Sequence, residues 1–514
     1  MTKTSKLAAL FWFTNFDDGK DVGLFVNFWI DVSRIWSRSW GRKCRELWKS
    51  LAISGISGIT VYLIYTLLSS SLCCQSSKVL NTKVALYTWR RPHSSANNSP
   101  TSIDHLMFAI AGSSNLWGNR RWYIEAWWRP NITRGFLFLD RPPIEHLPWS
   151  STSPPFRLYE DDSKYKAYNK HKMPFAIRMV RVIEQIFKAK NDGVRWYVMA
   201  DDDTVLFMDN LLEVLSRYDH RKYFYIGMNS ESISSNDINS FGMAFGGAGY
   251  ALSYPLAKAV AKNMDLCIER YPTVFGSDHI LQSCIADLGV SLTQEKGFHQ
   301  IDLRRDISGF LSAHPQSPFL SLHHLDAVDP IFPSMNRFES VNHLMKAAKV
   351  DQSRLLQQSV CNYKQNNWTL SVSWGYSVQI YHKILAPSVL YRPLETFIPW
   401  KKGATPPYMF NTRVPKSDPC EVPQFLFFAS VDETKMNNHI ITTYTATSPP
   451  PSPPPSVSSS TCSTYNIRKI RVLSPMKKHG GFGSRRECCD IVQEVGMDSM
   501  AIKLRNCMKD EMVA

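Results

Sequence analysis

From about residue 105 onward, short apolar runs alternate with longer amphipathic stretches. The runs at 106–112, 135–140 and 195–200 are rich in aromatic or aliphatic residues, and each is followed by small or acidic residues. This is typical of buried strands in an α/β sheet. Between them, residues 116–128 follow serines that can cap a helix, and residues 175–190 place apolar side chains at helical spacing. The order strand, helix, strand, helix, strand predicts a parallel sheet with right-handed crossovers.

The pattern continues and then changes. Residues 223–228 predict a strand, 241–253 a glycine-containing loop between apolar runs, 255–265 a helix, and 272–289 a helix with Asp278 at its start. Beyond about 345, residues 370–381 alternate apolar and polar positions, as a half-buried strand does. Further strands are expected at 425–431 and 467–473. We therefore predict an α/β domain over 104–344 and a β-rich accessory domain over 345–514, with a Pro/Ser-rich insertion at about 445–460.

The N-terminal region carries a different signal. Residues 51–72 contain no charged residue and are long enough to cross a bilayer as a helix. Arginine and lysine dominate the preceding flank and are scarce in the following one, which predicts a cytosolic segment 1–50 and a lumenal remainder. Residues 73–103, rich in Ser, Asn and Thr, then read as a stem. A cleaved signal peptide or a buried soluble helix are the competing interpretations.

Charge and cysteine content narrow the classes of function. The formal net charge is +15, but no zinc-finger spacing, aromatic RNA-binding signature or lysine-rich block is present, which argues against a nucleic-acid partner. Eight cysteines lie beyond Cys73 and Cys74, which border the apolar segment, and this even set allows disulfides in an oxidising lumen and leaves their pairing open. Three glycosylation sequons begin at Asn97, Asn131 and Asn367. The eight cysteines are Cys267, Cys284, Cys361, Cys420, Cys462, Cys488, Cys489 and Cys507.

Three consecutive carboxylates, Asp201, Asp202 and Asp203, follow the strand at 195–200. Ligands of open α/β sheets bind at the carboxyl ends of the strands. Crowded carboxylates repel one another unless a cation lies between them, and oxygen ligands suit Mg²⁺ or Mn²⁺. A solvated acidic turn is the simpler alternative. Neighbouring side chains of a strand point to opposite faces. Asp201 and Asp203 can therefore converge, while Asp202 is free to bind the ribose of a nucleotide ligand or nearby backbone.

Together these segments resemble the Fringe-type β-1,3-glycosyltransferases, and more closely the plant Fringe-related proteins of the DUF604 group. The matching pieces occur in one order: FAIAGSSNLW, RWYVMADDDTVLFMDNLLEVLSRYD, MAFGGAGYALSYPLA, FGSD at 275–278, GFHQID and SLHHLDAVDP. The resemblance covers about 105–332 and extends, through SVCNYK and SRRECCD, into the accessory region. It implies a GT-A fold and transfer of a sugar from a nucleotide donor with inversion at the anomeric carbon.

The resemblance also implies roles for individual residues. Asp201 and Asp203 match the positions that hold Mn²⁺ against the donor diphosphate, and His324, with His323 as the second choice, matches a late histidine that completes the metal shell. Asp278 matches the catalytic base, although Ser277 replaces the first acid of the family's acidic pair. The expected donor-binding and loop residues are Asp202, Gly246, Gly247 and Gly249, the glycines lining the acceptor side.

We therefore expect a single-pass type II Golgi membrane enzyme that transfers a sugar, expected to be a hexose in β-1,3 linkage, from a UDP-sugar to a glycan or glycoprotein acceptor. The alternative is a catalytically silent relative that binds glycans or scaffolds other enzymes, which the substitution at Ser277 motivates. The donor sugar, the acceptor and the oligomeric state do not follow from the sequence, because a resemblance transfers chemistry better than specificity.

Overall fold

The computed structural model describes residues 99–513, except 164, 166–172, 190–191, 316–317, 418–420, 435–438, 447–466, 477–485 and 494–497. The chain divides into two compact units, Met1–Ala96 and Asn97–Ala514, and all described residues belong to the second. The predicted span at 51–72, most of the stem, Asn97, Cys420, Cys462 and the Pro/Ser-rich insertion lie outside the described residues. Within the described residues, no helix has both the length and the apolar character that a membrane crossing requires.

The first sheet is mixed rather than wholly parallel, in the order β3-β2-β1-β4-β7-β6-β8. Strands β3, β2, β1 and β4 pair in parallel as predicted, but β7 runs antiparallel to both β4 and β6. The connection from β6 to β7 contains only the short helix α8 and does not cross the sheet. Adjacent strands joined in this way run antiparallel, because a parallel pair needs a crossover connection. The strands are β1 Leu106–Ala111, β2 Gly135–Leu139, β3 Phe156–Leu158, β4 Trp196–Asp201, β6 Tyr225–Gly227, β7 Tyr250–Ser253 and β8 Leu292–Gln294.

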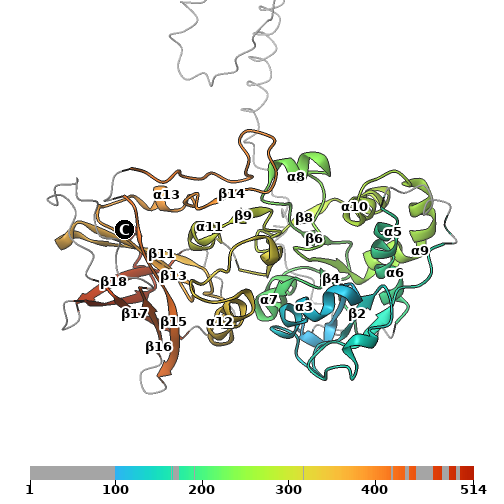
Figure 1. The fold of residues 1–514 in the computed structure, drawn as a ribbon, viewed down its shortest axis with the longest axis horizontal. Coiled ribbons are helices and arrows are strands. Elements are labelled where there is room, and N and C mark those ends of the chain that lie inside the picture. The colour runs from blue at the N-terminus through green and yellow to red at the C-terminus, as the bar shows by residue number, and fades with distance from the viewer. Residues whose placement is uncertain are drawn as a thin grey trace, which may run out of the picture. The chain divides into compact units, whose positions relative to one another are not determined.

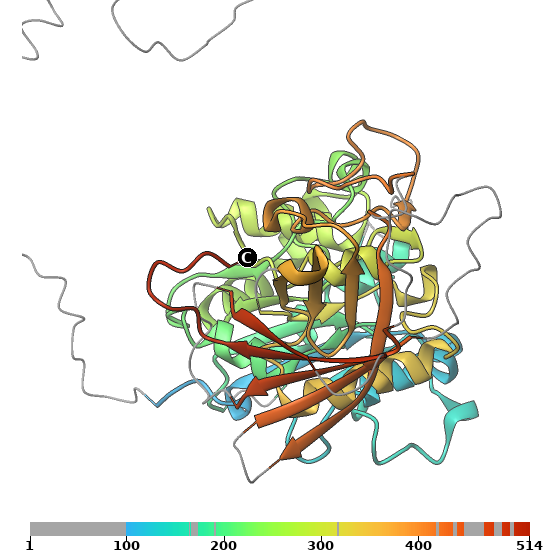
Figure 2. The ribbon, with the colours of Figure 1, turned by 90° about the vertical axis from the view of Figure 1, so that its left-hand side faces the viewer.

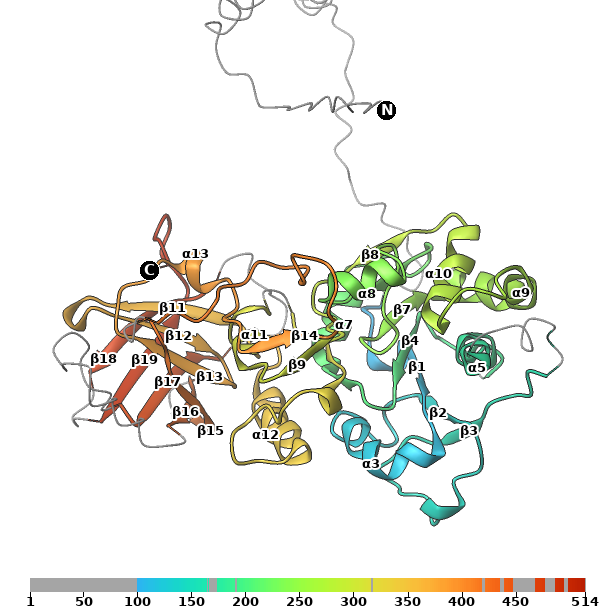
Figure 3. The same ribbon diagram turned by 45° about the horizontal axis from the view of Figure 1, so that its top comes forward.

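Helices cover both faces of this sheet (Figure 3). Along β1, Leu106, Phe108 and Ile110 belong to one hydrophobic cluster with α3, whereas Met107 and Ala109 belong to another with α5, α6, α9 and α10. This two-residue alternation between two covered faces explains why the strands read as continuous apolar runs. The predicted helix at 175–190 is two helices that meet at Arg181. The helices around this sheet are α3 Ser114–Glu125, α5 Pro174–Val180, α6 Val182–Phe187, α7 Met208–Leu215, α8 Ile233–Ile238, α9 Tyr254–Arg270 and α10 Ser277–Asp287.

The second sheet has eight strands, drawn in orange to red in Figure 2, in the order β11-β12-β13-β15-β16-β17-β19-β18. Their bounds are β11 Gln358–Tyr363, β12 Trp368–Ser373, β13 Ser377–Tyr381, β15 Gln424–Thr434, β16 His439–Thr445, β17 Lys469–Pro475, β18 Cys488–Gln493 and β19 Ser499–Arg505. The remaining helices are α11 Ser308–Ala313, α12 Arg337–Val350 and α13 Pro387–Leu390. Helix α12 packs on β15 and α11 on β12.

The predicted half-buried strand at 370–381 is a pair of strands, β12 and β13, and both are buried on each face. The alternating polar residues predicted an exposed face, but serines among them are buried and form hydrogen bonds within the protein. Ser373 Oγ donates to the carbonyl of Leu311 in α11, and Ser377 Oγ lies 2.8 Å from Ser312 Oγ. Buried hydroxyl groups that are hydrogen-bonded in this way carry little penalty, so the polar face of the hairpin is covered by α11.

Three disulfides occur within the described residues. Cys267–Cys284 ties α9 to α10, and Cys361–Cys489 and Cys488–Cys507 tie β18 to β11 and to the C-terminal segment. The adjacent cysteines of β18 point to opposite faces, so each reaches a different partner. Asn131 and Asn367 of the sequons are exposed at turn positions with φ of 62° and 57°.

Residues 391–413, which we call the strap, leave the second sheet and lie against the first part of the protein. Strand β14 (Phe397–Pro399) pairs antiparallel with β9 (Leu303–Arg305), beside α8 and α11 in Figure 1. The amide of Met409 donates to the carbonyl of Glu231, and that of Ile233 to the carbonyl of Pro407. The strap therefore adds its residues to the edge of the molecule where the carboxyl end of β4 lies.

Candidate metal and nucleotide-sugar site

The three carboxylates lie where β4 ends. Asp201 is the last residue of β4 and pairs with Ala111 of β1, and Asp202 and Asp203 form the turn that follows. The chain then enters β5 (Val205–Leu206), which pairs antiparallel with β10 (Ser321–Leu322). Because His323 directly follows β10, this short pairing carries it to the acids across more than a hundred residues of chain.

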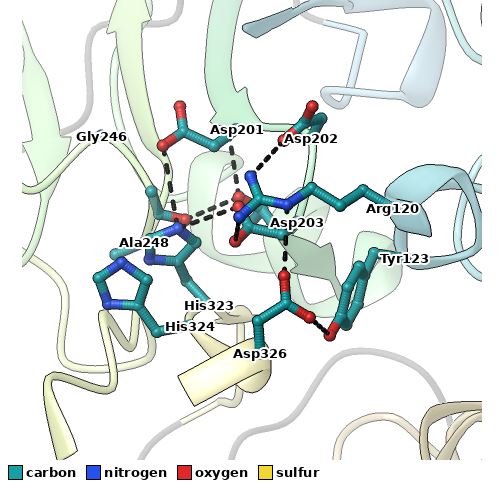
Figure 4. A network of polar contacts seen from close by, with 12 residues as sticks. Arg120, Tyr123, Asp201, Asp202, Asp203, Gly246, Ala248, His323, His324 and Asp326 are labelled. Carbon is teal, nitrogen blue, oxygen red and sulfur yellow. Dashed lines mark hydrogen bonds and ion pairs between the residues drawn. The ribbon is translucent and has the colours of Figure 1, made fainter. Parts of the chain in front are cut away.

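Asp201, Asp203 and His323 form a group whose ligand atoms all lie within 4.8 Å of one another. His323 Nε2 is 3.1 Å from Asp203 Oδ1 and 3.8 Å from Asp201 Oδ2 (Figure 4). Asp203 Oδ1 is buried and accepts no hydrogen bond of ordinary geometry from the described residues. Two carboxylates and one imidazole form a donor set that Mn²⁺ accepts, and the oxygen without a hydrogen bond favours a cation here. The arrangement fits a divalent ion.

The structure places His323 in this group, whereas the sequence favoured His324 with His323 as second choice. His324 turns away in a left-handed backbone conformation, with φ of 55°. Its Nδ1 lies 3.0 Å from Asp302 Oδ1, and its ring stacks on Trp400 of the strap. The two imidazole rings lie side by side, with centroids 3.9 Å apart, and it is His323 whose ring nitrogen groups with the carboxylates.

Arg120 of α3 neutralises the acids on their other side. Its guanidinium nitrogens lie 2.8 Å from Asp202 Oδ1 and 3.2 Å from Asp203 Oδ2, while its Nε lies 3.3 Å from Asp326 Oδ2. The Tyr123 hydroxyl donates to the other oxygen of Asp326 (Figure 4). Asp202, which also accepts the amide of Ser113, is thus held by local groups, and Asp203 keeps its Oδ1 for the metal side.

The crowded acids have strongly shifted pKa values. Burial, followed by the neighbouring carboxylates, raises the pKa of Asp201 to about 7, although His323 opposes this shift. Burial and Asp203 raise the pKa of Asp202 to about 6 against the pull of Arg120. Burial also disfavours ionisation of Asp203, but His323 and Arg120 outweigh it and lower the pKa of that carboxyl below its usual range. Such a cluster of acids is stabilised by added positive charge.

The glycine loop makes room for two of the predicted functional side chains. The Gly246 amide donates to Asp278 Oδ2 at 2.8 Å, and a Cβ at Gly246 would lie 2.4 Å from Asp278 Oδ1. A Cβ at Gly247 would lie 2.1 Å from Cε1 of His323. Gly249 has φ of 87°, a conformation that favours glycine. The first two glycines are therefore needed for close approach of protein side chains, in addition to any role toward a ligand.

Asp278 lies in the first turn of α10, two residues after the cap position, which is Gly276. It is therefore not the N-cap that such an aspartate often is. Burial raises the pKa of Asp278, while the Gly246 amide and the Ser277 hydroxyl, 3.3 Å from Oδ1, partly offset this. Ser277 thus replaces an acid with a hydrogen-bond donor. Asp278 also influences the pKa of Asp201, so the two carboxylates share one site.

Sequence reasoning missed Arg120, Tyr123, Asp326 and Trp400. A signal existed for Arg120, because a helix that starts at the carboxyl end of β1 brings its first turns to the acids at the end of the neighbouring β4. The position of Trp400 depends on the pairing of β14 with β9, and no local pattern foretells that pairing.

Two comparisons show which known proteins the chain is similar to. Residues 235–489 match a family model described as "Protein of unknown function, DUF604". This range includes Asp278, His323 and the strap. Among curated proteins, the human "Beta-1,3-glucosyltransferase" is 24% identical over 209 residues, covering 37% of this chain and 38% of that relative. The chain thus spans well under half the length of that relative.

Proposed function

We propose that this chain, a Fringe-like DUF604 protein related to the glycosyltransferases, transfers a sugar from a UDP-sugar to a glycan or glycoprotein acceptor with inversion at the anomeric carbon. The observation that carries the proposal is the convergence of Asp201, Asp203 and His323 at the carboxyl end of β4, beside Asp278. A hexose donor and a β-1,3 linkage follow the printed name of the human relative. A GT-A fold is supported by the mixed sheet with its single reversed strand β7.

In the proposed mechanism, Asp201, Asp203 and His323 hold Mn²⁺ or Mg²⁺. The cation, when bound, stabilises negative charge on the leaving diphosphate. Arg120 binds Asp202 Oδ1 and Asp203 Oδ2, and Asp203 Oδ1 is the oxygen that would bind the cation. Arg120 also lowers the pKa values of Asp202 and Asp203, which opposes the effect of burial on both carboxyls.

Asp278 is the proposed base. An inverting transfer needs one group that accepts the proton of the attacking acceptor hydroxyl. The Gly246 amide binds Oδ2 of Asp278 at 2.8 Å and the Ser277 hydroxyl donates to Oδ1 at 3.3 Å, and the second lone pair of Oδ1 would receive the proton. Burial raises the pKa of Asp278, and a raised pKa strengthens a carboxylate as a base. We propose that the enzyme acts in the Golgi as a type II membrane protein, on the strength of the apolar segment at 51–72.

The test is UDP release by the purified full chain from a panel of UDP-sugars, with and without Mn²⁺, alongside Asp203→Asn and Asp278→Asn. We expect metal-dependent turnover by the wild type, loss of nucleotide binding in Asp203→Asn, and loss of turnover with retained Mn²⁺-dependent UDP binding in Asp278→Asn. If all three proteins match the donor-only blank across the panel, the enzyme proposal is wrong. Metal-dependent UDP binding without turnover would instead favour the catalytically silent relative.

A further inference from the structure

A second group of potential ligands lies apart from the carboxylates, in a cavity of about 380 Å³. The cavity is bounded by the loop after β6, by the segment before β9, by the residue that follows α11 and by the strap. Its wall includes Glu231, His299 and His314, with Lys296 and Arg392 at its exposed rim. None of these residues takes part in the proposed transfer.

Glu231 and His299 form a buried pair in this wall. His299 Nδ1 lies 2.9 Å from Glu231 Oε1, and the other carboxylate oxygen accepts the amide of Ile301 at 2.8 Å. His299 is 2% exposed, and its Nε2 has no hydrogen-bond partner among the described residues. Nδ1 is the ring nitrogen that lies beside the carboxylate, so it is the atom of His299 that would share a ligand with Glu231.

His314 completes the group. It follows α11, stacks on Phe310 with ring centroids 4.4 Å apart, and is half-buried toward the cavity. Its ring centroid lies 5.5 Å from that of His299. Both imidazoles therefore lie in the wall of the same cavity.

We propose that Glu231, His299 and His314 bind a zinc-class divalent cation. One carboxylate oxygen and one nitrogen from each imidazole lie within 4.8 Å of one another. Ligands of a tetrahedral zinc ion are about 3.4 Å apart at zinc–ligand distances near 2.1 Å, so a small side-chain adjustment brings all three to one ion. Two imidazoles with one carboxylate favour Zn²⁺, Co²⁺ or Ni²⁺ over Mg²⁺ or Ca²⁺.

The surroundings define the kind of site. Three protein ligands with a remaining position open to a cavity resemble an open zinc site more than a closed structural one. The rim charges of Lys296 and Arg392 favour an anionic or neutral fourth ligand. The simpler alternative is a hydrogen-bonded core pair that anchors the strap, since the Met409 amide donates to the Glu231 carbonyl. That alternative explains Glu231 but does not explain why His314 approaches the same pair.

The experiment loads the full chain, stripped with chelator, with ZnCl₂, removes excess by desalting, and counts zinc per chain by mass spectrometry. A parallel sample is loaded with Co²⁺, whose visible d–d absorption reports four- or five-coordinate sites. The variants are His299→Gln and His314→Gln. His343→Gln serves as the matched control, because His343 is also buried but binds the Phe428 carbonyl through Nε2. Asp203→Asn separates this site from the carboxylate group.

We expect each of His299→Gln and His314→Gln to hold one zinc equivalent fewer than the wild type and to lose the cobalt absorption. Asp203→Asn and His343→Gln should retain both. If His299→Gln fails to fold by circular dichroism, His314→Gln, altered at a half-exposed position, decides alone. The proposal is overturned if the wild type holds no zinc after desalting, if His314→Gln holds as much as the wild type, or if His343→Gln loses the same equivalent. None of these results depends on sugar transfer.

Discussion

Replacing Gly247 with alanine should disrupt the group formed by Asp201, Asp203 and His323 without replacing any of these three residues. A Cβ at Gly247 would lie 2.1 Å from His323 Cε1 and 2.4 Å from both ring nitrogens, whereas ordinary contact begins near 3.4 Å. The imidazole must therefore move by about 1.3 Å, the difference between 3.4 and 2.1 Å. His323 is 3% exposed, so it cannot move into solvent, and the displacement separates Nε2 from Asp203.

The consequence is a weaker metal site and slower catalysis. Losing one of three protein ligands should raise the Kd for Mn²⁺ at least about tenfold, which corresponds to about 1.4 kcal/mol. A misplacement of about 1 Å in a catalytic group costs on the order of 10²-fold in rate. The assay is Mn²⁺ titration followed by electron paramagnetic resonance, in which only free Mn²⁺ gives the sharp six-line spectrum. It needs no knowledge of the donor or acceptor.

The matched control is Gly242→Ala in the same loop. A Cβ there would lie 3.5 Å from Ser240 Oγ and 3.7 Å from Gln282 Nε2, both ordinary contacts. This variant should bind Mn²⁺ like the wild type. If Gly247→Ala folds normally and also binds Mn²⁺ like the wild type, His323 is not a ligand and the reasoning is refuted. His323→Ala, which introduces no clash, should reproduce the loss of affinity and thereby exclude a purely steric effect.

Other perturbations test neighbouring parts of the site. Gly246→Ala, whose Cβ would lie 2.4 Å from Asp278 Oδ1, should lower turnover in a UDP-release assay and leave the Mn²⁺ affinity unchanged; an unaltered turnover would contradict the role of Asp278. Asp278→Asn should be at least as stable as the wild type at neutral pH. Because burial raises the pKa of Asp278 above its ordinary 3.8, the native state favours the protonated carboxyl. Its contribution to stability is therefore present at low pH and lost as pH rises through the raised pKa, so the advantage of the asparagine variant in urea unfolding should grow with pH. Arg120→Gln should lower the free energy of unfolding by about 3 kcal/mol, since it leaves the buried Asp202 without its counter-charge and Asp203 with His323 alone. Adding Asp202→Asn should restore part of that loss, and strict additivity in the double-mutant cycle would count against a direct pair.

Local patterns in the sequence predicted the elements around the site well. The runs at 106–112 and 195–200 are β1 and β4, their parallel pairing is as expected, and the acids emerge at the carboxyl end of β4. These elements are predictable because β1 and β4 are buried on both faces and the stretch 175–190 has apolar residues at helical spacing. The proposed metal-holding role of Asp201 and Asp203 stays a prediction that the measurements above address.

What the sequence did not predict depends on long-range pairing. The reversal of β7 arises from a connection that never crosses the sheet, and the position of His323 arises from the two-residue pairing of β5 with β10. Strands β5, β7 and β10 are too short to leave a periodic signal in the sequence. Serines in β12 and β13 read as solvent-facing because hydropathy alone cannot anticipate hydrogen-bonding partners supplied by α11.

The strap limits where the chain can be truncated without loss of folding. The strap connects β13 and β15 of the second sheet. Its strand β14 nevertheless pairs with β9, and Met409 and Pro407 form backbone hydrogen bonds with Glu231 and Ile233 near α8. A fragment ending near residue 344 would keep every predicted catalytic residue but expose the edge of β9, and exposed strand edges promote self-association. One hydrophobic cluster also includes residues from both sides of that cut, such as Phe310 and Phe397. The proposed catalytic residues and the β-rich half are therefore expected to form a single cooperative folding unit.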